Sequence, residues 1–147
     1  MIMSWAKLLS ENRVTALAPN KAELDNLRSI VTRSLKDVTA AGLSADARFV
    51  MAYDAARTLS LLIVRAAGYR PRSVGAHYNT FLALEVADPA FASLSAYFDT
   101  CRLKRNNCEY DVAGGVSDTD ADGLLKMVQQ FAADAERWIR THYPHLS

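Results

Sequence analysis

The sequence predicts an all-α fold: an antiparallel up-and-down bundle of four main helices, with a short N-terminal helix and a short additional helix. Apolar residues recur at helical spacing along most of the chain, and no convincing run alternates with period two. Only 6 Gly and 4 Pro occur in 147 residues, which are too few turn-forming residues for a many-stranded β fold. The connections are short, as between antiparallel neighbours. The length fits one domain covering residues 1–147.

The first half of the chain predicts three helices. A short amphipathic segment covers residues 3–10. The next helix begins at Asn20, with Glu23 placed to complete a capping-box variant, and ends at Gly42 as a left-handed cap. The third helix, 45–67, is predicted to be capped by Ser44 and is apolar on most of its faces. Such a helix is central in a bundle or faces a second protomer.

The second half predicts three more helices. One covers roughly residues 73–86. Asp88 then serves as a cap, with Pro89 at the first helical position, for a helix that runs over residues 90–111. The last helix covers about 120–142.

Charge and composition limit the classes of function. Half of the residues are hydrophobic and 22% are charged, as in an ordinary globular domain. Lys and Arg total 17 against 16 Asp and Glu, a net charge of +1. This excludes a broadly basic protein that holds nucleic acid by bulk charge, but it permits a compact cationic site.

The cysteine spacing and the lack of a long apolar segment both point to the cytoplasm. Cys101 and Cys108 lie two helical turns apart, too far for a disulfide, and no His lies near them in sequence. We expect them to be reduced small hydrophobes, and we expect no metal and no cofactor. No signal-peptide pattern opens the chain, and the longest apolar stretch, 59–67, is too short to span a bilayer. The sequence therefore predicts a cytoplasmic protein without membrane contact.

One segment late in the 90–111 helix concentrates polar chemistry. It contains Arg102, Lys104, Arg105, Asn106, Glu109 and Tyr110. Several of these lie three or four residues apart and share a helix face. Arginine forks suit phosphate, an amide can orient a phosphate or ribose hydroxyl, and a phenol can stack on a base. The alternative is a solvated helix end, in which Arg105 and Glu109 form a surface ion pair.

Two further features have both a structural and a functional interpretation. His77 lies inside the 73–86 helix, where an imidazole is either a hydrogen-bonded structural group or part of a ligand site. Arg65, Arg70 and Arg72 crowd one corner. They are either the solvated, cationic end of a helix or a second phosphate contact.

Three parts of the chain, taken in order, resemble the HEPN superfamily (higher eukaryotes and prokaryotes nucleotide-binding domain). They are residues 54–57 with the turn at 68–71, the helix start at 75–78, and the motif at 105–111. The resemblance covers a motif core of residues 44–143.

The resemblance implies a homodimer and metal-independent cleavage of RNA, with an Arg and a following His from each protomer meeting at the interface. The family Arg falls on Arg105 and the polar residue after it on Asn106. Tyr110 stands at the His position, so this chain is an Arg-x4-Tyr variant. The resemblance thus implies Arg105, Asn106 and Tyr110 as catalytic residues. Arg102, Lys104, Glu109 and His77 are then the residues that bind RNA or nucleotide.

The Tyr in place of His bears on the chemistry. A phenol with a pKa near 10 is a weaker general base at neutral pH than an imidazole with a pKa near 6.5. Glu109 and His77 are the other candidates for that role.

Three functional hypotheses follow. The first is a ribonuclease of the toxin type, from a toxin–antitoxin or defence system, whose antitoxin is a small nucleotidyltransferase that modifies a Tyr near the motif. The second is a non-catalytic HEPN module that binds nucleotide, RNA or a protein partner. The third is a purely structural helical protein.

Overall fold

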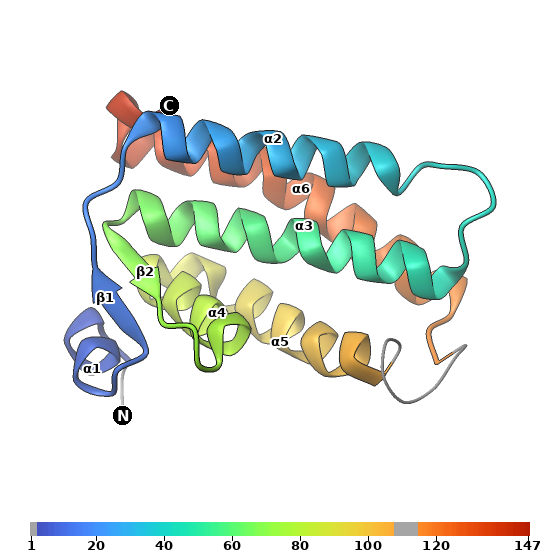
Figure 1. Cartoon of the computed structure of the whole chain (residues 1–147), viewed down its shortest axis with the longest axis horizontal. Coiled ribbons are helices and arrows are strands. Elements are labelled where there is room, and N and C mark those ends of the chain that lie inside the picture. The colour runs from blue at the N-terminus through green and yellow to red at the C-terminus, as the bar shows by residue number, and fades with distance from the viewer. Residues whose placement is uncertain (1–2, 108–114) are drawn as a thin grey trace.

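The computed structural model describes residues 3–107 and 115–147, and it confirms the predicted all-α bundle (Figure 1). The long helices are α2 (Lys21–Asp37), α3 (Ala45–Ala66), α4 (Ala76–Ala87), α5 (Ala92–Asn106) and α6 (Asp118–His142). The short elements are α1 (Trp5–Ser10), β1 (Val14–Ala16), β2 (Tyr69–Pro71) and the 3-10 helices η1 (Pro89–Phe91) and η3 (Pro144–Leu146).

Helix α3 is the centre of the bundle. It packs against α2 and α6 on one side and against α4 and α5 on the other (Figure 1). Burial extends around most of its circumference, as its apolar sequence predicts. Its large buried side chains Phe49 and Tyr53 join Phe81, Phe98 and Phe131 in one core. In the described part of the chain, no helix is both long enough and apolar enough to cross a membrane.

A two-stranded antiparallel sheet was not predicted. Strand β1 pairs with β2, with Val14 opposite Pro71 and Ala16 opposite Tyr69. Three residues a strand are too few for a period-two pattern to be visible in the sequence. The indole of Trp5 stacks on the Tyr69 ring at a centroid distance of 3.9 Å, which holds α1 against β2.

The predicted N-terminal caps of α2 and α3 are present, while the predicted C-terminal cap at Gly42 is wrong. The Asn20 side chain accepts a hydrogen bond from the Glu23 N–H, and Ser44 caps α3 in the same way. Helix α2 ends at Asp37, so Gly42, with φ +84°, lies in the loop rather than at the helix end.

The predicted boundaries in the second half also change. Gly75, with φ +70°, is the residue before α4, so that helix begins later than the expected residue 73. The Asp88 carboxylate caps η1, and α5 follows from Ala92. The predicted end of this helix at residue 111 lies outside the described residues.

Arg65 is buried, so its assignment to a solvated helix end is wrong. Its side chain is 3% exposed and donates to both carboxylate oxygens of Glu23. It also donates to the backbone carbonyls of Leu17, Ala18 and Tyr69. One guanidinium thus joins the segment before α2 to α3 and β2. The Glu23 side chain is used in this pair, which is why the capping box predicted at Asn20 is only half formed.

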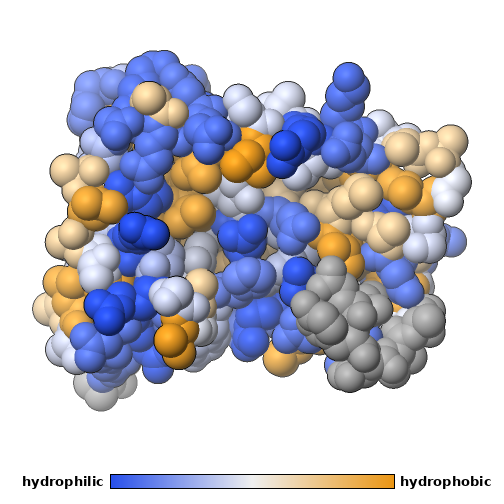
Figure 2. Space-filling model, in the orientation of Figure 1, coloured by the Kyte–Doolittle hydropathy of each residue, from blue (hydrophilic) through white to orange (hydrophobic). Residues whose placement is uncertain are grey.

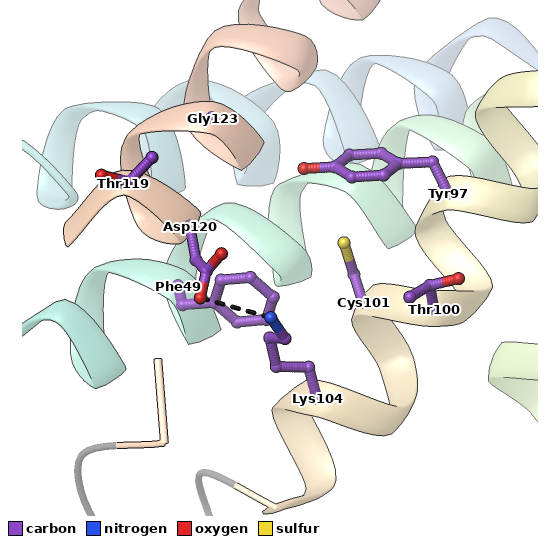
Figure 3. A pocket seen from close by; sticks show the side chains of 8 residues that line it. All are labelled: Phe49, Tyr97, Thr100, Cys101, Lys104, Thr119, Asp120 and Gly123. Atoms are coloured by element: carbon purple, nitrogen blue, oxygen red, sulfur yellow. Dashed lines mark hydrogen bonds and ion pairs between the residues drawn. The ribbon is translucent and has the colours of Figure 1, made fainter. Parts of the chain in front are cut away.

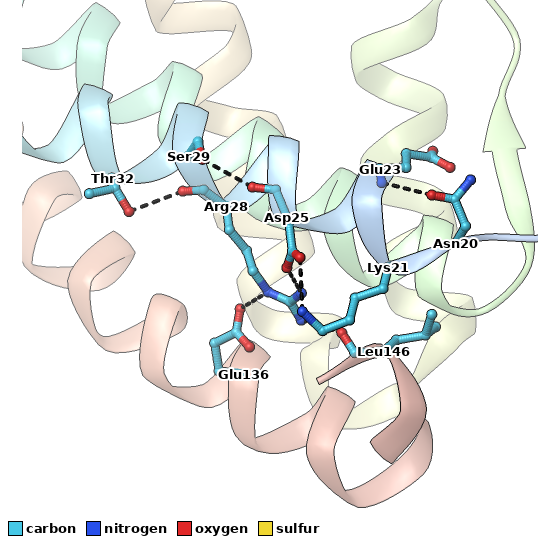
Figure 4. A network of polar contacts seen from close by, with 9 residues as sticks. All are labelled: Asn20, Lys21, Glu23, Asp25, Arg28, Ser29, Thr32, Glu136 and Leu146. Atoms are coloured by element: carbon cyan, nitrogen blue, oxygen red, sulfur yellow. Dashed lines mark hydrogen bonds and ion pairs between the residues drawn. The ribbon is translucent and has the colours of Figure 1, made fainter.

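A second arginine ties the C-terminal end to α2 (Figure 4). Arg28 donates to Glu136 on α6 and to Asp25 on its own helix, both at 2.8 Å. It also donates to the Leu146 carbonyl in η3 at 2.8 Å. The end of the chain is therefore fixed against the same face of the bundle as α2.

We expect Arg65→Ala to destabilise the fold by about 2–4 kcal/mol, because three carbonyls lose a donor and Glu23 loses its counter-ion. The measurement is the free energy of unfolding from urea titration. Arg70→Ala is the matched control, since Arg70 lies on β2 and is exposed; we expect a change within about 0.5 kcal/mol. Equal effects of the two substitutions would contradict this role for Arg65.

Candidate functional site

A buried tyrosine holds the imidazole of His77. The Tyr53 hydroxyl on α3 and Nδ1 of His77 on α4 lie 3.0 Å apart. Tyr53 has no exposed surface. Burial raises the pKa of Tyr53 far above its ordinary value, so the phenol stays neutral at every physiological pH. The imidazole is therefore positioned by a fixed neutral partner.

Three arginines act on this imidazole. Arg57 projects from α3, and Arg102 and Arg105 project from α5. Burial, followed by Arg57, Arg105 and Arg102, lowers the pKa of His77 to about 4. His77 is thus neutral at pH 7 although its surroundings are cationic.

The same arginines differ in their own partners. Arg102 donates to Asp99 at 2.8 Å, and the Arg105 guanidinium carbon lies 5.7 Å from the centroid of the Tyr53 ring. The Nε atom of Arg57 is buried and has no hydrogen-bond partner among the described residues. A buried guanidinium N–H without a partner is costly, which favours an anion as its partner.

A hollow opens at the start of α4, beside these groups. It is lined by His77, Arg102 and Asn106 together with the loop before α4. The N-cap residue is Gly75, and no side-chain capping hydrogen bond is made at the start of the helix. Uncapped N–H groups and the helix dipole both favour an anion here. Figure 2 shows hydrophilic side chains gathered over α4 and α5 on this face.

The structure brings together four of the residues that the sequence singled out: Arg102, Arg105, Asn106 and His77. The hollow and the electrostatic coupling to His77 join them, although His77 comes from a different helix. Glu109 and Tyr110 lie outside the described residues, and so does Cys108.

Lys104 lies apart from this group. Its Nζ pairs with Asp120 at the start of α6, at 3.2 Å (Figure 3). It lines a small cavity together with Tyr97 and Cys101. Cys101 is a free, buried thiol, as expected, and burial raises its pKa to about 11. Lys104 therefore joins α5 to α6 instead of adding a cation beside His77.

Tyr53 and Arg57 belong to the site, but the chemical interpretation of the sequence did not assign them a role. The available signal was an Arg in an otherwise apolar helix, one turn after a Tyr. Helical spacing places both side chains on one face of α3. It could not show that α4 and α5 pack against that face.

Comparison with family models, with curated proteins and with solved structures found no match for this chain. Within residues 3–107 and 115–147, no group of three His, Cys, Asp or Glu side chains could hold a metal ion.

We expect an NMR titration of the His77 ring to give a midpoint near pH 4, because the imidazolium is disfavoured by burial and by three cations. Arg57→Gln should raise the midpoint, since one of those cations is removed. Arg33→Gln, at an exposed position on α2, is the control and should leave it unchanged. A wild-type midpoint near 6.5 would contradict the proposed environment.

The lowered pKa of His77 also predicts how the free energy of unfolding depends on pH. The folded-state pKa lies below the ordinary value of 6.5, so between about pH 6.5 and pH 4 the unfolded chain binds more protons. The contribution of His77 to stability is complete above that window and is lost as the pH falls through it. Urea unfolding of the wild type and of His77→Gln should therefore differ in slope against pH within this window only.

Proposed function

We propose that the protein is a HEPN-like, RNA-directed protein that cleaves RNA without a metal ion. One observation carries the proposal: a neutral imidazole, held by a buried phenol, stands among three arginines of two facing helices. Phosphate groups are the ligands that arginine clusters and an uncapped helix start recognise best. An imidazole beside a bound phosphate is the usual group for proton transfer.

In the proposed reaction, the ribose 2′-oxygen attacks the adjacent phosphorus and the bond from phosphorus to the 5′-oxygen breaks. The products are a 2′,3′-cyclic phosphate and a 5′-hydroxyl. The 2′-hydroxyl proton passes to Nε2 of His77, and the leaving 5′-oxygen takes a proton from water. The hydroxide left behind takes up the proton from His77, which restores the neutral imidazole. For this step Nδ1 carries a proton and donates a hydrogen bond to the Tyr53 oxygen. Tyr53 is therefore a positioning residue.

The arginines stabilise the negative charge of the transition state in this reaction. Negative charge grows on the non-bridging phosphate oxygens in the transition state. Arg57, Arg102 and Arg105 offer N–H groups and positive charge on the side where His77 lies. Asn106, at the edge of the hollow, is placed to orient a phosphate or a ribose hydroxyl.

The resemblance to HEPN proteins supports the RNA as substrate and adds three expectations. We propose that the chain forms a homodimer in which two such sites face each other. We keep Tyr110 and Glu109 as candidate catalytic and RNA-binding residues at the end of the motif. We propose a toxin-like role, with a small nucleotidyltransferase as the antitoxin that modifies Tyr110.

A module that binds RNA or nucleotide without turnover is the second candidate. The low pKa of His77 favours it, because a base with a pKa of about 4 is weak at neutral pH. Both candidates use the same phosphate contacts, and they differ in whether product forms.

We expect the purified protein to degrade single-stranded RNA in EDTA and to leave 2′,3′-cyclic phosphate ends. His77→Ala and Arg105→Ala should each lower the rate about 100-fold or more, because each removes a group that acts in the transition state. Arg33→Ala and His145→Ala, at exposed positions, are the controls and should retain activity.

The pH profile separates a base from a purely structural imidazole. With His77 as general base, kcat/KM rises with pH through about 4 and then becomes level, since the neutral form is the active one. Folded wild-type protein that binds RNA but forms no product would select the binding module. Folded protein that neither binds nor cleaves would refute both.

A further inference from the structure

A second cationic hollow adjoins the first. It is lined by Arg13, Arg72, Asn79 and Glu11 at the end of the β1–β2 sheet. Ser73 lines both hollows, so the two meet at this residue of the loop before α4. Nothing in the chemistry at His77 uses this second hollow.

Tyr78 joins the two hollows. The guanidinium carbon of Arg13 lies 5.4 Å from the centroid of its ring, and that of Arg102 lies 5.5 Å from the same centroid. The two guanidinium groups are therefore separated by no more than the sum of these distances. Phosphates that are neighbours or next neighbours in a single strand can span such a separation.

The second hollow is held in a defined shape. Asn79 is 2% exposed, and its side chain accepts from Arg13 at 3.2 Å. Its amide nitrogen donates to the Val74 carbonyl at 2.9 Å, which fixes the loop. The backbone N–H of Arg72 donates to the Arg13 carbonyl at 2.8 Å. The Arg13 guanidinium is thus positioned by the buried Asn79, and the backbone at Arg72 is fixed to β1, while the Arg72 side chain itself remains exposed.

The charge of this hollow is net positive. Glu11 is its only carboxylate among the described lining residues, and it pairs with Lys7 at 2.9 Å and with Arg13 at 3.0 Å. Arg72 is exposed and makes no ion pair with any described residue. An anion at this place gains a free guanidinium.

We infer that Arg13 and Arg72 form a second phosphate subsite, so that the two hollows hold successive phosphates of one single-stranded RNA segment that passes Tyr78. This inference rests on the proposed function, because the first phosphate is the one among Arg57, Arg102 and Arg105. The subsite makes the ligand a segment of at least a few nucleotides rather than a mononucleotide. Of the corner formed by Arg65, Arg70 and Arg72, only Arg72 takes part.

The test uses 2′-O-methyl oligouridylates, which this protein cannot cleave, so binding is measured apart from turnover. Affinities of wild-type protein for uridine monophosphate and for chains of two, three and four nucleotides are compared by fluorescence competition at several salt concentrations. We expect affinity to rise along the series as the second subsite fills.

Arg72→Gln is the main variant, since its side chain is exposed and the fold does not depend on it. It should lower the affinity for the tetranucleotide roughly five- to tenfold and reduce the salt slope by about 0.7, the value for one phosphate of a single strand. It should leave the affinity for uridine monophosphate unchanged. Arg13→Gln should act in the same direction, and Arg70→Gln, an exposed neighbour on β2, is the control.

Different failures have different meanings. If Arg105→Gln weakens all ligands but Arg72→Gln and Arg13→Gln weaken none, the second subsite is refuted and the first stands. If affinity does not rise with chain length, the second subsite is also refuted. If neither monophosphate nor oligonucleotide binds, the proposed function fails. If a polyglutamate peptide competes as well as the tetranucleotide, the surface binds acidic protein and the inference is wrong.

Discussion

The burial of α3 is the constraint on which the rest of this structure depends. Every other long helix packs on or beside it, so leaving a polar atom that it buries without a hydrogen-bond partner is costly. Arg65 donates hydrogen bonds to Glu23 and to three backbone carbonyls, and these bonds fix the path of the chain into α2. Tyr53 is hydrogen-bonded to His77, and this bond fixes the imidazole beside α5. A single requirement, satisfying polar groups on a buried helix, therefore produces a structural contact at one position and a candidate site at another.

The two arginines of α3 show how these outcomes differ. The guanidinium of Arg65 has protein acceptors on all three of its nitrogens, so it has no capacity left for a ligand. Arg57 has a buried Nε without a partner in the described part of the chain, which costs about 1–3 kcal/mol for such a donor. Local rules are broken most often where function requires it. The missing hydrogen bond at Arg57 separates the candidate site from the structural contact at Arg65 more directly than charge does, since both residues carry the same charge.

The helices could be predicted from the sequence because their caps and apolar spacing are local features of the chain. Asn20 and Ser44 are caps in the structure as they are in the pattern. The contacts that the sequence could not supply are those that depend on how helices meet. Lys104 and Arg105 are adjacent in sequence, but one step around a helix sends the first to α6 and the second toward Tyr53. Likewise, no spacing rule could bring His77 to Arg102, because that contact requires α4 to lie along α5.

Burial and the charges of the neighbouring arginines together lower the pKa of His77, and an anion bound to those arginines would change that pKa. The arginines disfavour the imidazolium by their charge. A phosphate bound to Arg57 and Arg105 offsets part of that charge, so the pKa of His77 rises when the anion is in place. Linkage requires the converse as well: protonation of His77 strengthens anion binding by the same factor. The imidazole is then a weak base in the empty site and a stronger one in the occupied site. Under the proposed function, this coupling makes proton transfer by His77 most effective when a phosphate occupies the site.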